Sequence, residues 1–418
     1  MYDIIIIGGG VSGMIASVKA SEEGARVLLI EKNNSLGRKL SITGKGRCNI
    51  TNNKSMEFHF QNIYPRPRFL KYAYSVFFKD DIIFLLEKLG VKTTTERGDR
   101  VFPVSNNAKD IVNSLLHRIQ NSNITIQYKT TVKQIITEDN QVKGITIFHK
   151  NKTEFISAKH VIIATGGKSY PTTGSSGDGY QLASSIGHSV ITPRPALVPL
   201  ETQENVVKQV QGLTLKKVTA IVWIDGKKHS EQFGEMIFTH FGLSGPIILT
   251  LSTLLANALQ NNSQITISID LKPAIDEKKL DNRLIRDLEE NSKKSISNIC
   301  KLWLPSKLIP VFIEYAGIDR TKNGSQITGK ERRNLRNLMK SFSFQITGDR
   351  GFKEAIITAG GISTDEINAK SMESKLVNNL YFVGEIINLH GNTGGYNLQI
   401  AWSTGWLAAL TCTERLKE

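Results

Sequence analysis

Short apolar runs and helix-like segments alternate at the start of this chain. Residues 4–7 are four consecutive isoleucines, and such a short β-branched run predicts a buried parallel strand. The spacing of apolar residues in 11–23 predicts a helix that Gly24 ends, and residues 27–30 predict a second strand. The order strand, helix, strand predicts an α/β fold with a parallel sheet.

Two helices and one irregular stretch are predicted next. Residues 69–89 and 106–120 have the spacing of helices, whereas residues 33–52 are polar, rich in glycine and show neither period. A long irregular stretch inside a compact domain is usually functional. We therefore expect a binding loop there.

Alternating apolar and polar residues predict a β-meander attached to the sheet, with strands at 124–128, 132–136 and 142–148. Residues 160–164 predict another buried strand, and Thr165-Gly-Gly167 follow it directly. Ligands bind outside the carboxyl ends of parallel strands, so we expect this turn to line a site.

The pattern changes from about residue 197. Short strand-like runs surround an apolar helix at 246–259, and a charged region of helical spacing follows. Strand-like runs then return, and a last helix begins after Gly394-Gly395, so the middle of the chain reads as an insertion. The predicted boundaries are 1–196 and 351–418 for the first domain, 197–275 and 343–350 for a β-domain, and 276–342 for a helical insert.

The first strand leads into a glycine motif, in which Gly8, Gly10 and Gly13 match G-x-G-x-x-G. In such motifs the three glycines permit a tight turn, close approach of a pyrophosphate and close packing of the helix on the strand. Glu31 ends the second strand, where an acid can bind a ribose hydroxyl. This βαβ context predicts a dinucleotide site that prefers FAD or NAD to NADP.

Composition narrows the possible partners and compartment. A length of 418 residues predicts two or three domains. The net charge of +15 suggests either a nucleic-acid partner or a lysine-rich surface, and we favour the surface because the basic residues are scattered and no RNA-binding motif is present. Three widely separated cysteines support neither a metal site nor a dithiol centre and fit a reducing cytoplasm. We expect neither a signal peptide nor a membrane span.

Several motifs recur in a recognisable order along the whole chain. They are the glycine fingerprint, residues 37–49, 164–167 with 169–171, 173–179, 238–246, 358–361 and 394–397. Together they resemble the BaiN/aminoacetone-oxidase family of bacterial flavoproteins. The family often has serine where Thr43 stands, a change that keeps the hydroxyl group.

This resemblance implies a Rossmann-type FAD domain of glutathione-reductase type, with an inserted β-barrel-like domain and a small helical domain. It also implies FAD as the prosthetic group. Val132 is included below because the backbone at that strand usually meets the adenine in this fold. The fingerprint and the resemblance together imply FAD contacts at Gly8, Gly10, Ser12, Gly13, Glu31, Lys32, Arg38, Ser41, Gly46, Asn49, Val132, Thr165, Gly384, Glu385, Gly395, Asn397 and Leu398.

The expected activity is that of an FAD-dependent oxidoreductase, which transfers a hydride between flavin N5 and a small metabolite of the amine, ketone or enone type. His240, within the glycine-marked stretch 238–246, is the first candidate for an acid or base, with a structural role as the alternative. Tyr170 and Tyr396 are further candidates. We expect residues 197–344 to form a lobe over the flavin, with His240 close to the ring.

Two other functions remain open on the sequence alone. The charge of +15 would suit an FAD-dependent RNA-modifying or RNA-binding flavoprotein, although we do not expect a nucleic-acid partner. A flavin carrier without turnover is the other alternative. NAD(P)H is a candidate transient electron donor, yet no second G-x-G-x-x-G follows a strand, so a dedicated NAD(P)H domain is not expected.

Overall fold

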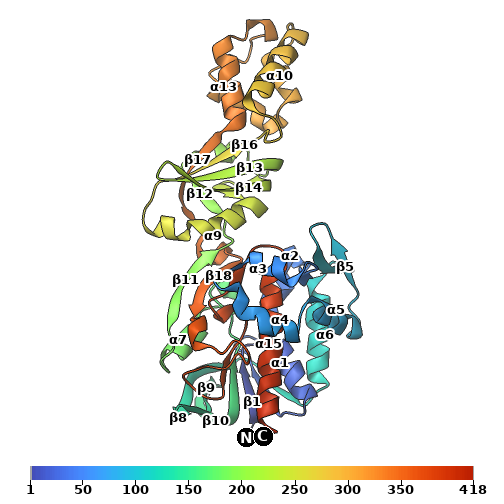
Figure 1. The fold of residues 1–418 in the computed structure, drawn as a ribbon, viewed down its shortest axis with the longest axis vertical. Coiled ribbons are helices and arrows are strands. Elements are labelled where there is room, and N and C mark those ends of the chain that lie inside the picture. The colour runs from blue at the N-terminus through green and yellow to red at the C-terminus, as the bar shows by residue number, and fades with distance from the viewer. Residues whose placement is uncertain (1, 418) are drawn as a thin grey trace. The chain divides into compact units, whose positions relative to one another are not determined.

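The computed structural model describes residues 2–417, except for the side chain of residue 257, and its chain divides into two compact units (Figure 1). The first unit contains Met1–Pro195 and Phe352–Glu418, and the second contains Ala196–Gly351. The first unit is therefore built from two separate stretches of sequence. None of the helices described in the structure is long and apolar enough to cross a membrane.

A seven-stranded sheet forms the centre of the first unit, in the order β7-β2-β1-β10-β9-β8 with β19 also paired to β10. Strands β7, β2, β1, β10 and β19 pair in parallel, and the first half of β10 pairs antiparallel with β9. The isoleucines of β1 at positions 4–6 are fully buried, as expected for a central strand. The strands are β1 (Tyr2–Ile7), β2 (Val27–Ile30), β7 (Ile124–Gln127), β8 (Thr131–Glu138), β9 (Gln141–His149), β10 (Lys152–Ile163) and β19 (Leu380–Phe382).

Helices cover this sheet, and three smaller sheets complete the unit (Figure 1). The helices are α1 (Val11–Glu22), α2 (Arg38–Gly46), α3 (Met56–Gln61), α4 (Lys71–Val76), α5 (Lys79–Lys88), α6 (Ala108–Gln120), α7 (Asp178–Ser184) and α15 (Tyr396–Arg415), with short 3-10 turns η1 (Pro67–Leu70), η2 (Pro171–Thr173), η6 (Thr364–Glu366) and η7 (Gly384–Ile386). The smaller sheets contain β3 (Thr51–Asn52) with β5 (Thr93–Glu96) and β6 (Arg100–Pro103), β4 (Ile63–Tyr64) with β20 (His390–Gly391), and β11 (Val190–Ala196) with β18 (Ile357–Ile362).

Helices α1 and α15 lie side by side, although they come from opposite ends of the sequence (Figure 1). Their contact is close at Gly405, where an added Cβ would lie 2.5 Å from the carbonyl oxygen of Ser12. The last helix is therefore part of the same layer that begins with the glycine motif.

Three expectations about the first unit are wrong. Residues 124–128 do not start the meander: β7 pairs in parallel with β2, because α6 returns the chain to the start of the sheet. The stretch 33–52 is not wholly irregular, since α2 lies in it, although Thr43, Gly44 and Lys45 leave helical geometry. The single helix expected at 69–89 is divided, because Phe77 and Phe78 have extended backbone between α4 and α5.

The second unit contains a closed six-stranded barrel, in the order β12-β15-β14-β13-β16-β17, which confirms the predicted fold class. The apolar helix α9 packs on this barrel, and the charged helices occur between β16 and β17. The elements are β12 (Leu200–Thr202), α8 (Val206–Gln209), β13 (Thr214–Ile224), β14 (Lys227–Phe238), β15 (Gly242–Ser244), α9 (Pro246–Gln260), β16 (Ile265–Asp270), α10 (Glu277–Glu290), α11 (Ile296–Ile299), α12 (Ile309–Tyr315), α13 (Gly329–Lys340), β17 (Phe342–Asp349) and the 3-10 turns η3 (Cys300–Leu302), η4 (Ser306–Leu308) and η5 (Gly324–Gln326). The short helix α14 (Gly351–Glu354) begins at the last residue of this unit and belongs otherwise to the first unit.

Ion pairs join the helical segment to itself and to the barrel. Arg332 of α13 pairs with Asp281 of α10 at 3.2 Å, and Lys340 pairs with Asp270 at the end of β16 at 2.6 Å. Much of the positive charge in this segment is thus already paired with carboxylates.

An ion pair at the first strand gives a pH-dependent contribution to stability. The Arg26 side chain lowers the pKa of Asp3 from 3.8 to about 2, and it donates to that carboxylate at 3.0 Å. Because the folded pKa is the lower one, this stability is present above the unfolded pKa and is lost as pH falls towards 2.

We expect Asp3→Asn to lower the free energy of unfolding by about 1 kcal/mol at neutral pH, since water screens the half-exposed Arg26. Urea unfolding at pH 7 and at low pH would measure it, with Lys228→Gln, in an exposed ion pair of the second unit, as the control. The difference from the parent chain should shrink as the medium is acidified. A constant difference would contradict this account.

Candidate functional site

The turn between β1 and α1 is closely packed at both ends and open in the middle. Gly8 has φ of +107°, and an added Cβ would lie 2.6 Å from the carbonyl oxygen of Ala164. A Cβ at Gly13 would lie 1.9 Å from the carbonyl oxygen of Gly8, whereas one at Gly10 would meet nothing within 4 Å. The turn therefore leaves space for a phosphate at Gly10, beside the N-terminus of α1.

Glu31 lies at the end of β2 and supports this turn. Its carboxylate is buried and accepts hydrogen bonds from the backbone N–H groups of Gly9 at 2.9 Å and Asn33 at 2.8 Å. A carboxylate has about four acceptor positions, so it can still accept a ribose hydroxyl. The side chain thus has a local structural role as well as the predicted cofactor role.

Lys32 and Arg38 are occupied by protein groups. Lys32 forms an ion pair with Asp178 at 2.7 Å and also contacts the Ser176 hydroxyl, and Arg38 donates to the Asn33 side chain at 2.7 Å. Their FAD contacts stay predictions.

The last residues of α2 and those that follow have an unusual backbone conformation. Gly44, Lys45 and Gly46 have φ of +58°, +59° and +83°, and Cys48 has φ of +60°. The N–H groups of Arg47 and Cys48 donate to the carbonyl oxygens of Gly44 at 3.3 Å and Thr43 at 3.0 Å, so these bonds hold the turn. Within this segment a Cβ at Gly46 would meet open space.

Two buried polar atoms near this segment and the sheet edge have no partner within the described chain. They are Oδ1 of Asn49 and the hydroxyl oxygen of Thr165. A buried polar atom without a hydrogen bond costs about 1–3 kcal/mol, a cost that a hydrogen-bonding ligand at this position would remove. Together with the open space at Gly10, these atoms fit a bound FAD.

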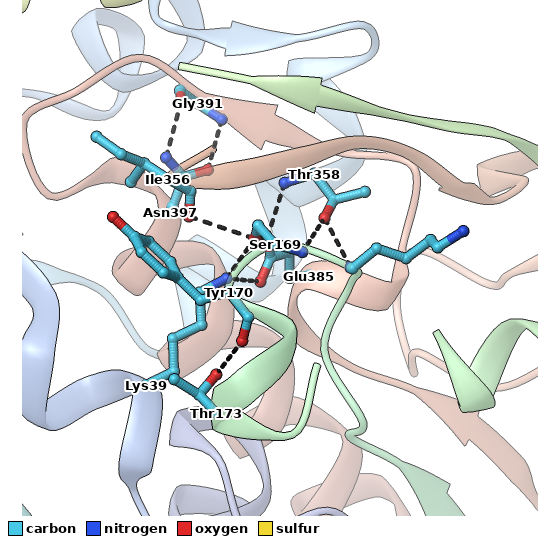
Figure 2. A network of polar contacts seen from close by, with 10 residues as sticks. Lys39, Ser169, Tyr170, Thr173, Ile356, Thr358, Glu385, Gly391 and Asn397 are labelled. Atoms are coloured by element: carbon cyan, nitrogen blue, oxygen red, sulfur yellow. Dashed lines mark hydrogen bonds and ion pairs between the residues drawn. The ribbon is translucent and has the colours of Figure 1, made fainter. Parts of the chain in front are cut away.

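Glu385 is the centre of a polar network at the carboxyl edge of the sheet (Figure 2). Its Oε1 accepts from the Ser169 hydroxyl at 2.8 Å and from the Thr358 N–H at 2.8 Å. Its Oε2 accepts from Lys39 at 2.7 Å, and Lys39 also donates to the Ser169 hydroxyl at 2.6 Å. The Thr358 hydroxyl accepts from the N–H groups of Lys168 at 2.8 Å and Ser169 at 3.1 Å.

Lys39, Ser169 and Thr358 were missed as site residues. Each belongs to a motif recognised in the sequence, at 37–49, 169–171 and 358–361. Glycines drew attention to these motifs, and the polar residues beside them were not assigned. The end of the strand at 160–164 was the signal that could have identified Ser169, whereas Thr358 lies at the start of β18, where that rule does not apply.

Close backbone packing and side-chain hydrogen bonds fix the N-terminus of α15. Gly395 has φ of +100°, and an added Cβ would lie 2.5 Å from the carbonyl carbon of Thr51. The Asn397 side chain accepts from the N–H of Gly391 at 2.7 Å and donates to its carbonyl oxygen at 2.7 Å (Figure 2). Asn397 thus shapes the turn before the helix.

The remaining predicted contacts lie on several elements of the first unit. Ser12 is buried beside Gly384, where an added Cβ would lie 2.6 Å from its hydroxyl. Ser41 donates to the Arg38 carbonyl at 2.7 Å. Leu398 is half-buried in α15, and Val132 is buried in β8, paired with Ile147. Direct contact of these residues with FAD stays a prediction.

The two candidate tyrosines differ in environment. Tyr396 is 4% exposed, its ring lies edge-on to that of His59, and burial raises the pKa of Tyr396 to about 12. Tyr170 is half-buried in the Ser169 segment, with φ of +52° and its N–H bonded to the Phe352 carbonyl at 3.0 Å. Burial, followed by the nearby Glu354, raises the pKa of Tyr170. Tyr170 is therefore the better placed of the two for proton transfer.

His240 lies in the second unit, exposed in the turn between β14 and β15, with its ring edge-on to Phe241. The glycines that marked this stretch serve the barrel. A Cβ at Gly242 would lie 2.2 Å from the Leu200 carbonyl oxygen, and one at Gly245 would lie 2.8 Å from the Met236 Cα. Close packing of strands explains the motif, and the catalytic role of His240 stays a prediction.

The cysteines are separate and buried. Cys48, Cys300 and Cys412 are all free thiols, and burial raises the pKa of Cys48 to about 12. Such a thiol stays protonated, so Cys48 acts as a packing residue beside the loop.

Comparisons with known proteins show the family of this chain. A family model described as "HI0933-like protein Rossmann domain" matches residues 2–411. The ribosomal RNA dihydrouridine synthase of Escherichia coli is 30% identical over 98% of this chain and 97% of its own length. The 3-dehydro-bile acid delta(4,6)-reductase of Clostridium scindens is 30% identical over 99% of this chain and 100% of its own length.

Solved structures share the fold. Mycobacterium smegmatis Sdh1 in the apo form has a TM-score of 0.54 at 18% identity and matches 100% of this chain and 68% of its own. The 3-ketosteroid delta1-dehydrogenase of Sterolibacterium denitrificans has a TM-score of 0.54 at 13% identity and matches 99% of both chains. The chain described here therefore belongs to the HI0933-like Rossmann family of FAD-dependent oxidoreductases, which includes the BaiN-type reductase.

Proposed function

We propose that this oxidoreductase reduces a carbon–carbon double bond conjugated with a carbonyl group in a small molecule. The observation that carries the proposal is the full-length relative named as a delta(4,6)-reductase of a 3-dehydro-bile acid. Of the amine, ketone and enone classes, this name favours the enone. When bound, FAD supplies the hydride from its N5 position.

The residues of the first unit have defined tasks in this proposal. The Gly8–Gly13 turn and the start of α1 bind the pyrophosphate, and Glu31 binds a ribose hydroxyl. Asn49 and Thr165, whose buried oxygens lack protein partners, hydrogen-bond the remainder of the cofactor. Reduction of an enone also needs a proton, for which Tyr170 and His240 are the candidate donors.

Anaerobic titration tests the proposal. The purified protein is first reduced with NADH or NADPH, which also tests these molecules as electron donors. The reduced protein is then mixed with a conjugated cyclic enone or the matching saturated ketone, and the oxidised protein is mixed separately with a primary amine. We expect the enone alone to restore the absorbance of oxidised flavin. Reoxidation of the reduced flavin by the ketone and not by the enone, or reduction of the oxidised flavin by the amine, would overturn the proposal.

A second candidate substrate is uridine in RNA. The uracil ring also has a carbon–carbon double bond conjugated with a carbonyl, so the same reduction would yield dihydrouridine. Relatives at 30% identity from Escherichia coli and Haemophilus influenzae are named ribosomal RNA dihydrouridine synthases, and this chain carries a net charge of +15. Reoxidation of the reduced protein by ribosomal RNA, with binding that weakens steeply as salt rises, would favour this candidate.

A further inference from the structure

The carboxylate of Glu385 lies against the glycine turn that follows β10. An added Cβ at Gly167 would lie 3.3 Å from the Glu385 carboxyl carbon, and one at Gly166 would lie 4.0 Å from its Oε2. This turn comes directly after Thr165, whose buried hydroxyl lacks a partner in the described chain. The carboxylate is therefore placed at the edge where a ligand of the parallel sheet binds.

Four segments of the first unit meet at this carboxylate. Lys39 comes from α2, Ser169 from the loop after β10, Thr358 from β18, and Glu385 from η7 (Figure 2). Three hydrogen bonds of 2.7–2.8 Å fill most of the acceptor positions of Glu385. Its side chain is thus fixed by protein donors before any ligand is present.

Lys39 is fixed in the same way, and one of its three N–H groups remains available to a ligand. An ammonium group has three N–H donors, and the described contacts use two of them, to Glu385 and to Ser169. The side chain is 23% exposed, so its charge is partly shielded from bulk water. A charge held in this manner acts on a nearby ligand more strongly than a freely solvated one.

We propose that Lys39 and Glu385 form a charge pair that sets the reduction potential of the bound flavin, with Ser169 holding the pair in position. Lys39 is a positioning residue for this carboxylate, and it was not among the site residues predicted from the sequence. The inference rests on FAD binding by this unit and not on the identity of the substrate. Its failure would therefore leave the proposed reduction of an enone untouched.

The pair gives opposite effects when either charge is removed. Lys39→Met leaves the carboxylate without its cation, and the uncompensated negative charge disfavours added electrons on the flavin. Glu385→Gln leaves the ammonium without its anion, and the positive charge favours them. The double variant removes both charges and should have a potential close to that of the parent protein.

The experiment is a spectroscopic measurement of the flavin midpoint potential against reference dyes, on protein with FAD bound. We expect Lys39→Met to shift the equilibrium towards oxidised flavin by at least tenfold, ~30 mV for a two-electron couple, and Glu385→Gln to shift it the other way. Lys39→Arg, which keeps the charge, should restore most of the parent potential. Lys19→Met is the matched control, because it removes a lysine from a 2.6 Å ion pair with Glu23 on α1.

Loss of packing alone would not produce shifts of opposite sign. Shifts in the same direction, or none beyond that of the Lys19 control, would overturn the proposal. If a single variant releases FAD, its affinities for oxidised and for reduced FAD are measured separately, because their ratio reports the shift in potential. Ratios that change in opposite directions in the two single variants support the proposal, and unchanged ratios overturn it.

Discussion

Gly13→Ala is expected to destabilise the first unit by about 3 kcal/mol or more, which is the upper end of the cost of overpacking a core. The added methyl group would lie 1.9 Å from the Gly8 carbonyl oxygen, a backbone atom that cannot rotate away. The backbone at Gly8 has no space to move away, since an added Cβ there would lie 2.6 Å from the Ala164 carbonyl oxygen. Denaturant unfolding of the FAD-free protein measures the loss.

Gly10→Ala is the matched control for this prediction. It adds the same methyl group two residues from Gly8, at a position that meets nothing within 4 Å. We expect normal stability without FAD and an affinity for FAD at least tenfold weaker, about 1.4 kcal/mol, because the methyl group occupies the space for the pyrophosphate. Equal unfolding curves for the two variants would refute the packing account of the motif.

Replacing Glu31 with alanine is expected to weaken FAD binding and also to lower stability without FAD. The loss of stability follows from the structure, because the carboxylate accepts hydrogen bonds from the backbone N–H groups of Gly9 and Asn33. Each effect should be about 1.5–3 kcal/mol, the usual range for hydrogen bonds to a charged group. Fluorescence titration with FAD and thermal unfolding of the apoprotein separate the two.

Glu31→Gln provides the comparison for this variant. Glutamine keeps one carbonyl acceptor for a backbone N–H group but loses the charge. It should therefore retain much of the apoprotein stability while still binding FAD more weakly. If alanine leaves the melting temperature of the apoprotein unchanged, the bracing role of Glu31 is wrong.

The sequence was most informative where the signal is local. The strand at 4–7, the glycine turn and the helix at 11–23 follow from adjacent residues whose periodicity and backbone freedom leave few alternatives. The parallel pairing of β7 with β2 was missed, because an alternating run of four residues does not reveal its partner. The short helix α2 was hidden by its polar residues and glycines, and its backbone leaves helical geometry at Thr43.

The polar network of the site was beyond sequence reasoning for a different reason. Lys39 and Glu385 are 346 positions apart, and nothing local to either residue identifies the other. The glycines near His240 show the opposite difficulty. They looked like the marks of a ligand site, but Gly242 and Gly245 are required by contacts within the barrel. A glycine signals close approach, and only the structure tells what approaches.

The pairing of α1 with α15 has a consequence for how the protein is made. Domains generally fold as units during synthesis, starting from the N-terminus. The second unit, Ala196–Gly351, is continuous in sequence and can fold while translation proceeds. Folding of the first unit cannot be completed until translation ends, because the ribosome makes the β1–α1 motif first and the α15 helix that packs on it last. FAD capture is therefore expected to be a post-translational event, and a chain stalled before residue 396 should emerge without its flavin.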